Sequence, residues 1–329
     1  MVNKKDDGKL FSFSASDVFP MKLFTNGDIM KSILKRGYIP PAHVQLNPTN
    51  NCNQNCPFCS CSERDKKLEL SYDEVNYAMT KFKEKGCVGV TVTGGGEPLM
   101  HKDIHRIIDR LSELEIEIGL VSNGWLLPKI KNDFHKLRWV RISQDDYKDV
   151  HRLVDTVLEP LINGQTDFAF SYVVSAKPDY DKIEKVVRFA NKKNMTHVRL
   201  VTDLLDLDNV PEMSTIKSEL DSRGVDDSKV IYQGRKAFEH GAKDCWVSLL
   251  RPVVDAKGDI FPCCGTQYLD KDPSLNYHDE AKMGNIKDID KIWSDQQKFN
   301  GSVCFRCYYG GYNKALDVLI KGIEHKEFI

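Results

Sequence analysis

Short hydrophobic runs alternate along most of the chain with longer segments of helical periodicity. At Val75, Met79 and Phe82, apolar residues recur every three or four positions, which is the spacing of one buried helix face. Ser71 and Glu74 precede this stripe as a capping box, which marks the start of the helix. The same criteria predict helices at 72–82, 103–114, 146–162 and 180–193, and strands at 44–47, 88–93, 117–122, 139–143, 168–174 and 198–201.

Strands that alternate with helices at this spacing indicate an α/β fold with a mostly parallel sheet. Six such units are too few for a complete eight-stranded barrel. In folds of this kind, the residues that bind ligands or perform chemistry lie at the carboxyl ends of the strands. The candidate chemistry is therefore expected directly after each hydrophobic run.

Three further segments flank or follow these units. Residues 1–42 form an N-terminal extension with a helix at 26–36, closed by the prolines 40 and 41, which restrict the preceding backbone. Residues 206–243 are a connector or a remnant of further barrel units, with a helix at 214–223 and a strand at 229–232. Residues 244–329 contain a hairpin at 249–262 and a final helix from Asn313.

Composition excludes several classes of protein. The 329 residues carry a formal net charge of -1, so no basic excess points to nucleic acid. The N-terminus lacks the apolar segment of a signal peptide, and no apolar run reaches the about 18 residues of a membrane span. We therefore expect a cytoplasmic protein without a membrane or nucleic-acid partner. In that compartment, its ten cysteines indicate metal binding rather than disulfides.

Three of these cysteines form a compact motif after the first predicted strand. Cys52, Cys56 and Cys59 have the spacing C-x3-C-x2-C, and Phe58 precedes the third. Cubane iron–sulfur clusters usually take four cysteine ligands, so three thiolates leave one iron free to bind a small chelating molecule. A zinc knuckle is the alternative, with Cys61 as fourth ligand, but zinc motifs usually repeat C-x2-C.

The motif C-x3-C-x-aromatic-C resembles that of the radical S-adenosylmethionine (SAM) superfamily. The resemblance implies a partial (β/α)6 TIM barrel over residues 43–205, a [4Fe–4S] cluster, and SAM bound to the free iron. The turn Thr93-Gly-Gly-Gly-Glu-Pro98 and the strand ends near 122 and 143 resemble the family's SAM-binding segments. Arg199 could reach SAM or substrate, or pair with Asp203. The implied cofactor-binding residues are Phe58, Gly94, Gly95, Gly96, Glu97, Ser122, Asn123, Ser143 and Arg199.

A second group of cysteines follows residue 240. The predicted hairpin delivers Cys263 and Cys264 after Cys245, and Cys304 and Cys307 form a later C-x2-C pair. Together they could supply four thiolates to one metal site. A four-cysteine zinc ribbon and an iron–sulfur cluster both fit this spacing.

The second group resembles the SPASM/twitch domain of radical SAM enzymes through Gly258-x4-Cys263, the following Gly-Asn-Ile and Ile-Trp, and Cys304-x2-Cys307. No cysteine follows Cys307, so the resemblance implies the short, twitch-like form with one auxiliary [4Fe–4S] cluster. The four residues between Gly258 and Cys263 match the motif, which favours Cys263 over Cys264 as a ligand. The expected ligands are Cys245, Cys263, Cys304 and Cys307, and Cys264 is either a hydrogen-atom donor or a buried spectator.

The resemblance implies an enzyme that reductively cleaves SAM to a 5′-deoxyadenosyl radical, which then removes a hydrogen atom from a substrate. The auxiliary cluster would assist oxidation or bond formation. The extension is too short for a separate peptide-binding module, which favours a small-molecule substrate. Alternatives are a peptide-modifying enzyme, an epimerase with a thiol hydrogen donor, and a non-catalytic iron–sulfur or zinc regulatory protein. Flavodoxin or ferredoxin is the expected electron donor.

Overall fold

A computed structural model describes residues 3–4, 10–11, 19–148, 166–235, 239–266, 281–304, 306–322 and 324–325. Within these residues, ten strands form one sheet in the order β12-β11-β10-β3-β4-β5-β6-β7-β8-β9. The strands β3 to β9 are parallel to their neighbours. They are β3 (His43–Leu46), β4 (Gly89–Val92), β5 (Glu117–Ser122), β6 (Leu137–Gln144), β7 (Asp167–Val174), β8 (His197–Thr202) and β9 (Val230–Gln233). The six predicted strands and the α/β class are confirmed.

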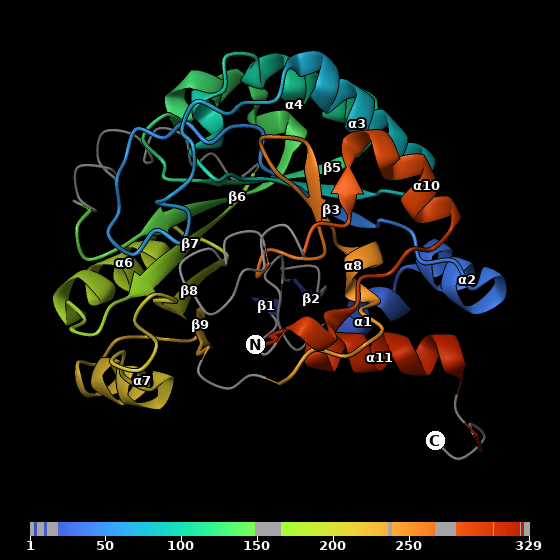
Figure 1. The fold of residues 1–329 in the computed structure, drawn as a ribbon. Helices are drawn as coiled ribbons and strands as arrows, with labels where there is room; N and C mark the ends of the chain where they lie inside the picture. The colour runs from blue at the N-terminus through green and yellow to red at the C-terminus, as the bar shows by residue number, and fades with distance from the viewer. Residues whose placement is uncertain are drawn as a thin grey trace.

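Helices form an arc around the outside of the curved sheet (Figure 1). In the helix that follows β3, Ser71 Oγ accepts from Glu74 N at 3.2 Å while Glu74 Oε2 accepts from Ser71 N at 2.8 Å, as the capping box predicts. The predicted helix at 146–162 lies almost wholly outside the described residues. The others are α3 (Tyr72–Glu84), α4 (Ile104–Glu113) and α6 (Tyr180–Lys192), and short 3₁₀ segments occupy Pro98–Met100 and Leu127–Lys136.

The segment predicted as a connector or a remnant of barrel units contains such a unit. Helix α7 (Met213–Ser222) is followed by β9, which pairs in parallel with β8 from Val198↔Val230 to Val201↔Gln233. Ile216 and Leu220 bury the inner face of α7. The parallel sheet therefore continues one strand beyond the six units.

The predicted hairpin is joined to the other edge of the same sheet. Strand β10 (Val253–Val254) pairs in parallel with β3, and β11 (Asp259–Phe261) returns antiparallel to β10. Strand β12 (Gly284–Asn285) then pairs with β11. The C-terminal region thus extends the barrel sheet, which places its cysteines beside the first barrel strand.

Helices of the N-terminal extension pack against the C-terminal region. Helices α1 (Phe19–Phe24) and α2 (Gly27–Arg36) contact α11 (Gly310–Lys321), and the Gln296 side chain hydrogen-bonds the backbone of Ile39. The extension therefore packs on the C-terminal region. The remaining elements are β1 (Asn3–Lys4), β2 (Leu10–Phe11), α8 (Val247–Leu250), α10 (Ile289–Ser294) and the 3₁₀ segments Ile286–Asp288 and Gly301–Val303.

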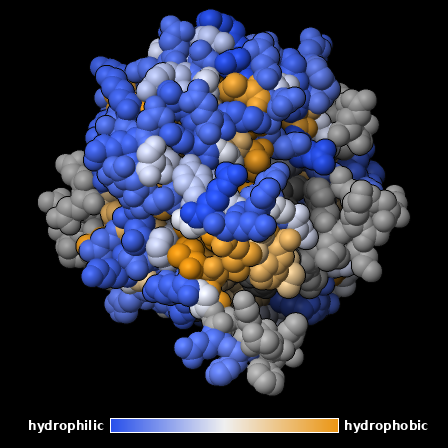
Figure 2. Space-filling view, turned by 90° about the vertical axis from the view of Figure 1, so that its right-hand side faces the viewer, coloured by the Kyte–Doolittle hydropathy of each residue, from blue (hydrophilic) through white to orange (hydrophobic). Residues whose placement is uncertain are grey.

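The face that carries α2, α10 and α11 is mostly hydrophilic, with a small group of hydrophobic side chains near its centre (Figure 2). Large exposed apolar residues on α1, α2 and α11 include Met21, Phe24, Leu34 and Val318. No helix in the described residues has the length and apolar content that a bilayer crossing requires.

Candidate functional site

The first three cysteines lie on one loop between β3 and α3. The Cys59 amide donates to the Cys56 carbonyl at 3.1 Å, which turns the loop back on itself. A hydrogen bond from Cys61 and the nearby Arg64 guanidinium, whose Nη1 is 3.5 Å from Cys59 Sγ, lower the pKa of Cys59 to about 5. Burial raises the pKa of Cys56 to about 11. Cys59 is therefore prepared as a thiolate, the form that binds metal.

The glycine turn after β4 packs directly on this cysteine loop. Gly96 N donates to Thr49 O at 3.0 Å, and Glu97 N donates to Asn51 O at 2.8 Å. A Cβ on Gly96 would lie 2.0 Å from Asn51 O, and one on Gly94 would lie 2.4 Å from Gly96 O. Glycine is thus required at position 96 because the backbone of the cysteine loop approaches it closely. Gly95 lies between them and is buried.

Glu97 joins the turn to the end of β5. Its buried carboxylate accepts from Ser122 Oγ at 2.8 Å, Asn123 N at 2.7 Å and Leu99 N at 3.2 Å. Burial raises its pKa, because desolvation outweighs these hydrogen bonds. Asn123 Nδ2 in turn donates to Asn53 Oδ1 on the cysteine loop at 2.7 Å. The residues predicted from three separate segments therefore form one network.

Sequence reasoning missed Lys148, which completes this network. The side chain is buried, and its Nζ donates to the Asn123 carbonyl at 3.1 Å and to the Ser143 carbonyl at the end of β6. Burial lowers its pKa, and nearby Asp145 and Cys56 oppose that effect. No sequence signal separates this lysine from the many on the surface. Phe58, predicted beside the cofactor, stacks on Tyr147 with ring centroids 6.3 Å apart.

The structure brings the second set of cysteines together. Besides burial, the neighbouring thiols of Cys264, Cys245 and Cys304 raise the pKa of Cys263, and those of Cys307 and Cys304 raise the pKa of Cys245. Burial raises the pKa of Cys245 to about 12 and that of Cys304 to about 11. Metal binding at this position must therefore displace the thiol protons.

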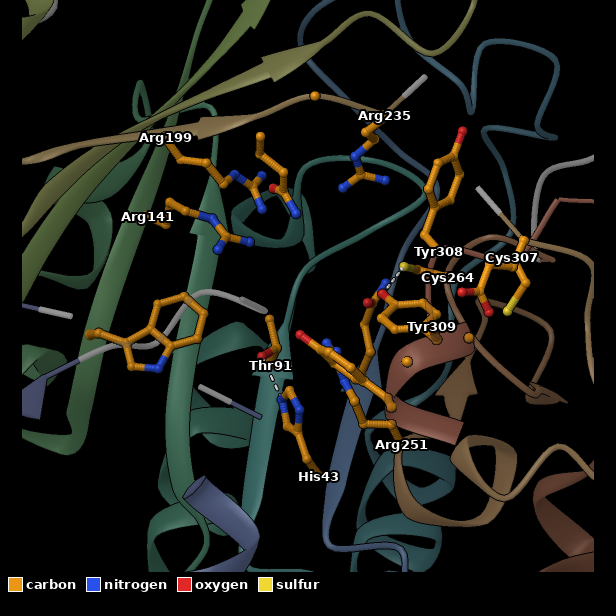
Figure 3. A pocket seen from close by; sticks show the side chains of 18 residues that line it. His43, Thr91, Arg141, Arg199, Arg235, Arg251, Cys264, Cys307, Tyr308 and Tyr309 are labelled. Atoms are coloured by element: carbon orange, nitrogen blue, oxygen red, sulfur yellow. Dashed lines mark hydrogen bonds between the residues drawn. The ribbon is translucent and has the colours of Figure 1, made fainter. Parts of the chain in front are cut away.

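Cys264 lies next to Cys263 and also contacts Tyr309. Its Sγ is 3.2 Å from the hydroxyl oxygen of Tyr309, and it lines a cavity of about 510 Å³. Cys264 is half-buried and borders the cavity, so it is not sealed in the core, and its role as hydrogen-atom donor or spectator stays a prediction. Cys307 lines the same cavity (Figure 3).

The opposite wall of the cavity comes from the barrel strands. His43 and Gln45 on β3, Thr91 on β4, Arg141 on β6 and Arg199 on β8 face it. Residues two apart on a strand lie on the same face of the sheet. Polar residues at alternate positions of these hydrophobic strands were therefore the sequence signal that could have predicted this wall. Only Arg199 was singled out from the sequence.

Arg199 does not form the ion pair with Asp203 that the sequence allowed. Its Nη2 and Nε donate to Ser171 Oγ on β7 at 2.7 and 3.1 Å. Burial, together with the charges of Arg141 and Arg235, lowers the pKa of Arg199 well below its usual value. Asp203 instead accepts from the Leu205 amide at 2.9 Å. The guanidinium is thus directed into the barrel because Arg199 is on its inner face.

His43 is neutral in this basic surrounding. One ring nitrogen, Nε2, is 2.8 Å from Thr91 Oγ1. Burial and the charges of Arg251, Lys22 and Arg141 lower its pKa to about 3. It can therefore position Thr91 or a bound molecule by hydrogen bonding without adding charge.

The two cysteine sets fit iron–sulfur clusters in donor chemistry. In the part of the chain that the structure describes, no three His, Cys, Asp or Glu side chains converge as closely as a single metal ion requires. A four-iron cube is bound at its corners, so its ligands stand farther apart than those of one zinc ion. Thiolates are the usual ligands of such cubes and also bind zinc, so the donor chemistry of both cysteine sets fits iron–sulfur clusters without excluding zinc.

Models of two protein families match the chain. The radical SAM superfamily matches residues 46–204, and the SPASM iron–sulfur cluster-binding domain matches residues 245–314. The first range contains the cysteine loop, the glycine turn and the strand ends. The second contains the five cysteines that follow residue 240.

Curated relatives share part of this region. GTP 3′,8-cyclase of Staphylococcus carnosus is 28% identical over 209 residues, covering 55% of this chain and 59% of the relative. The S-adenosylmethionine-dependent nucleotide dehydratase of Selenomonas ruminantium is 25% identical over 185 residues, covering 54% and 62%. The chain therefore matches about three fifths of the length of these relatives.

Solved structures share the fold over a larger part of the chain. SuiB of Streptococcus suis bound to S-adenosylmethionine superposes with a TM-score of 0.60 at 15% identity, covering 90% of this chain and 76% of that one. The anSMEcpe structure with AdoMet and the Kp18Cys peptide gives 0.52 at 16% identity, covering 87% and 86%. At these identities the likeness establishes the fold.

Proposed function

The chain belongs to the radical SAM superfamily and carries a C-terminal SPASM iron–sulfur domain, and on that premise we propose that it removes a hydrogen atom from a small molecule held between two [4Fe–4S] clusters. One observation carries the proposal: a single cavity is bounded by the barrel strands on one side and by Cys264 and Cys307 on the other. Membership of this family makes the chain an enzyme, which sets aside a purely regulatory protein.

We assign the first cluster to Cys52, Cys56 and Cys59. When bound there, it supplies the electron that cleaves SAM to methionine and a 5′-deoxyadenosyl radical. Arg64 and Cys61 favour the thiolate of Cys59, and Lys148 places a cation near Cys56. The chain thus offsets part of the negative charge that three thiolates bring to one loop.

We assign SAM to the surface formed by the glycine turn and the ends of β5 and β6. Glu97 already accepts three hydrogen bonds from the chain, so its role is to position the turn. The polar atoms of residues 93–96 would then bind the SAM ammonium group. Further polar groups for SAM come from Ser122, Asn123 and Ser143. Phe58 stacks on Tyr147, with ring centroids 6.3 Å apart.

We assign one auxiliary cluster to Cys245, Cys263, Cys304 and Cys307. With four thiolate ligands it has no free iron, so it would accept an electron from a substrate radical without binding the substrate. We favour Cys263 over Cys264 because of the spacing Gly258-x4-Cys263, and Cys264 Sγ is 3.2 Å from the hydroxyl oxygen of Tyr309.

A second candidate function rests on the position of Cys264. A thiol that borders the cavity can return a hydrogen atom to a substrate radical, and the product would then be an epimer. The thiyl radical left on Cys264 would have to regain one electron, which the auxiliary cluster could supply, and one proton from solvent. Cys264→Ala, assayed in deuterated water with the natural substrate, tests this function. Loss of product with both clusters retained supports hydrogen return, and unchanged product excludes it. Solved structures of SuiB and anSMEcpe contain a bound peptide, so a peptide substrate remains an alternative for either function.

The main proposal is tested by SAM cleavage. Anaerobically reconstituted protein with dithionite and SAM should form 5′-deoxyadenosine. The triple variant Cys52/Cys56/Cys59→Ala should lose this activity yet keep the auxiliary cluster signal in electron paramagnetic resonance. Unchanged cleavage in the variant would refute the assignment.

We also propose that the protein is cytoplasmic and that flavodoxin or ferredoxin is its electron donor in the cell, where dithionite is absent.

A further inference from the structure

Four arginine side chains line the cavity that Cys264 and Cys307 border. Arg141 and Arg199 enter from the barrel strands, and Arg235 and Arg251 from segments that follow β9 and α8. Figure 3 shows the Arg141, Arg199 and Arg235 guanidinium groups directed into one space, with Arg251 on the side of Tyr309. Such a concentration of fixed positive charge is unusual in a partly buried site, where charges are normally paired.

The described lining supplies little negative charge to balance these cations. Glu239 is its only carboxylate, and it is half exposed and ion-paired with Lys314 at 3.0 Å. The Nε atoms of Arg141 and Arg235 are buried without a hydrogen-bond partner, as is Gln233 Oε1. Burial and the charges of Arg251 and Arg235 lower the pKa of Arg141 to about 10. Like charges are thus held together with unused donors, as expected of a site that awaits an anion.

Aromatic rings hold three of the guanidinium groups in place. The Arg141 guanidinium carbon is 5.6 Å from the Trp139 ring centre, and those of Arg235 and Arg251 are each 5.5 Å from the ring centres of Tyr308 and Tyr309. Contact through an aromatic face leaves the N–H edges of guanidinium free to donate. The arrangement is therefore preorganised for binding rather than for charge neutralisation within the chain.

The arginines lie next to the residues assigned to SAM. Arg141 precedes Ser143 by two positions on β6, so both face the barrel interior. Ser143 pairs in register with Ser171, the acceptor of both hydrogen bonds from Arg199. Cys264 borders the cavity on its other side. An anion bound by these arginines would therefore lie between the SAM site and the auxiliary cysteines.

We propose that the substrate is a phosphorylated small molecule with two or more negative charges, held by Arg141, Arg199, Arg235 and Arg251. This inference rests on the proposed function, since it names the class of molecule that the same cavity holds. One guanidinium fork satisfies the two oxygens of a carboxylate, whereas a phosphate ester offers three terminal oxygens and close to two charges to several forks. Four arginines thus exceed what a monocarboxylate or a neutral peptide requires.

Isothermal titration calorimetry of the full-length reconstituted protein with inorganic pyrophosphate tests the proposal. We expect one site per chain, with an affinity that falls as NaCl is raised. Arg141→Gln and Arg199→Gln should each weaken binding by about 100-fold, because each removes a charged donor from a partly desolvated site. Arg138→Gln is the matched control, since Arg138 lies on the same strand with 69% of its side chain exposed and should leave binding unchanged.

Ligand-free thermal stability separates binding from a structural role. If the arginines repel one another while awaiting an anion, the ligand-free variants should melt at or above the wild-type temperature. A clear decrease in melting temperature would indicate a structural role and overturn the proposal. If pyrophosphate removes iron from the clusters, the effect should be equally large in the control variant Arg138→Gln. Comparison with that variant therefore separates iron loss from binding at the arginines.

Titrations with citrate and acetate show which class of anion the site prefers. Binding of pyrophosphate but not acetate supports the proposal. Binding of citrate alone overturns the phosphate assignment, and absence of binding by every anion overturns the site. None of these measurements requires SAM cleavage, so failure of the anion site and failure of the radical chemistry are read separately.

Discussion

At the scale of single residues, Gly96 links the cysteine loop to the barrel. A Cβ there would lie 2.0 Å from Asn51 O and 2.5 Å from Asn50 C, both of them backbone atoms that cannot move independently. Gly96→Ala should therefore displace the loop, remove about half of the iron and weaken SAM binding at least tenfold. Gly89→Ala is the control, because its Cβ would find its nearest neighbour at an ordinary 3.8 Å. Iron analysis and calorimetry with SAM measure both effects; intact iron and SAM binding in Gly96→Ala would contradict the close approach.

His43 makes stability depend on pH. Its pKa is about 3 in the folded protein because of burial and the neighbouring cations, against about 6.5 in an unfolded chain. The unfolded state therefore takes up a proton first, and stability falls as the pH drops below 6.5. By pH 5 this costs at most about 2 kcal/mol.

His43→Gln should remove that part of the acid sensitivity. Urea midpoints measured at pH 7.5 and pH 5 should differ less in this variant than in the wild type. The exposed His135 provides the control, since His135→Gln should leave the difference unchanged. If the urea midpoint changes with pH equally in the wild type and in His43→Gln, the pKa of His43 is not lowered in the folded protein.

At the scale of elements, α10 connects the C-terminal region to the barrel through Trp293. The ring is fully buried and lies edge-on to Phe82 of α3, with centroids 5.2 Å apart, while Nε1 donates to the Leu249 carbonyl of α8 at 3.1 Å. Trp293→Ala should cost about 3–5 kcal/mol through the cavity that it leaves. Trp293→Phe should cost less, because it keeps most of the packing and loses the hydrogen bond.

The effect of Trp293→Ala on the clusters should be unequal. Because α8 follows Cys245 directly, loosening α8 should release auxiliary iron on heating before iron at the cysteine loop. Absorbance and iron release followed against temperature would show two steps in the variant. Simultaneous loss of both would indicate that the two regions unfold as one unit.

At the scale of the whole molecule, the metal content distinguishes the possible centres. Two four-iron clusters require about eight irons per chain and little zinc. Cys304→Ser with Cys307→Ser should halve the iron, while 5′-deoxyadenosine formation continues at the cysteine loop. Stoichiometric zinc with only four irons in the wild type would instead identify a zinc site in the C-terminal region.

The parts of this protein that could be predicted from its sequence are those determined by neighbouring residues. The C-x3-C-x2-C loop, the glycine turn and the Ser71–Glu74 capping box each depend on residues within a few positions. The strands and helices follow from periodic burial, which is also local. For these reasons the family and the α/β fold were both identified before the structure.

Only the tertiary structure placed the four arginines around one cavity. Arg141, Arg199, Arg235 and Arg251 come from separate segments, and β10 joins β3 across some two hundred residues of chain. Whether such residues meet depends on sheet order and on the direction of each side chain, which hydrophobic periodicity does not specify. The sequence by itself therefore determined the family and the cluster-binding motifs, through short-range spacing and burial. The position and charge of the arginine-lined cavity were decided by long-range strand pairing.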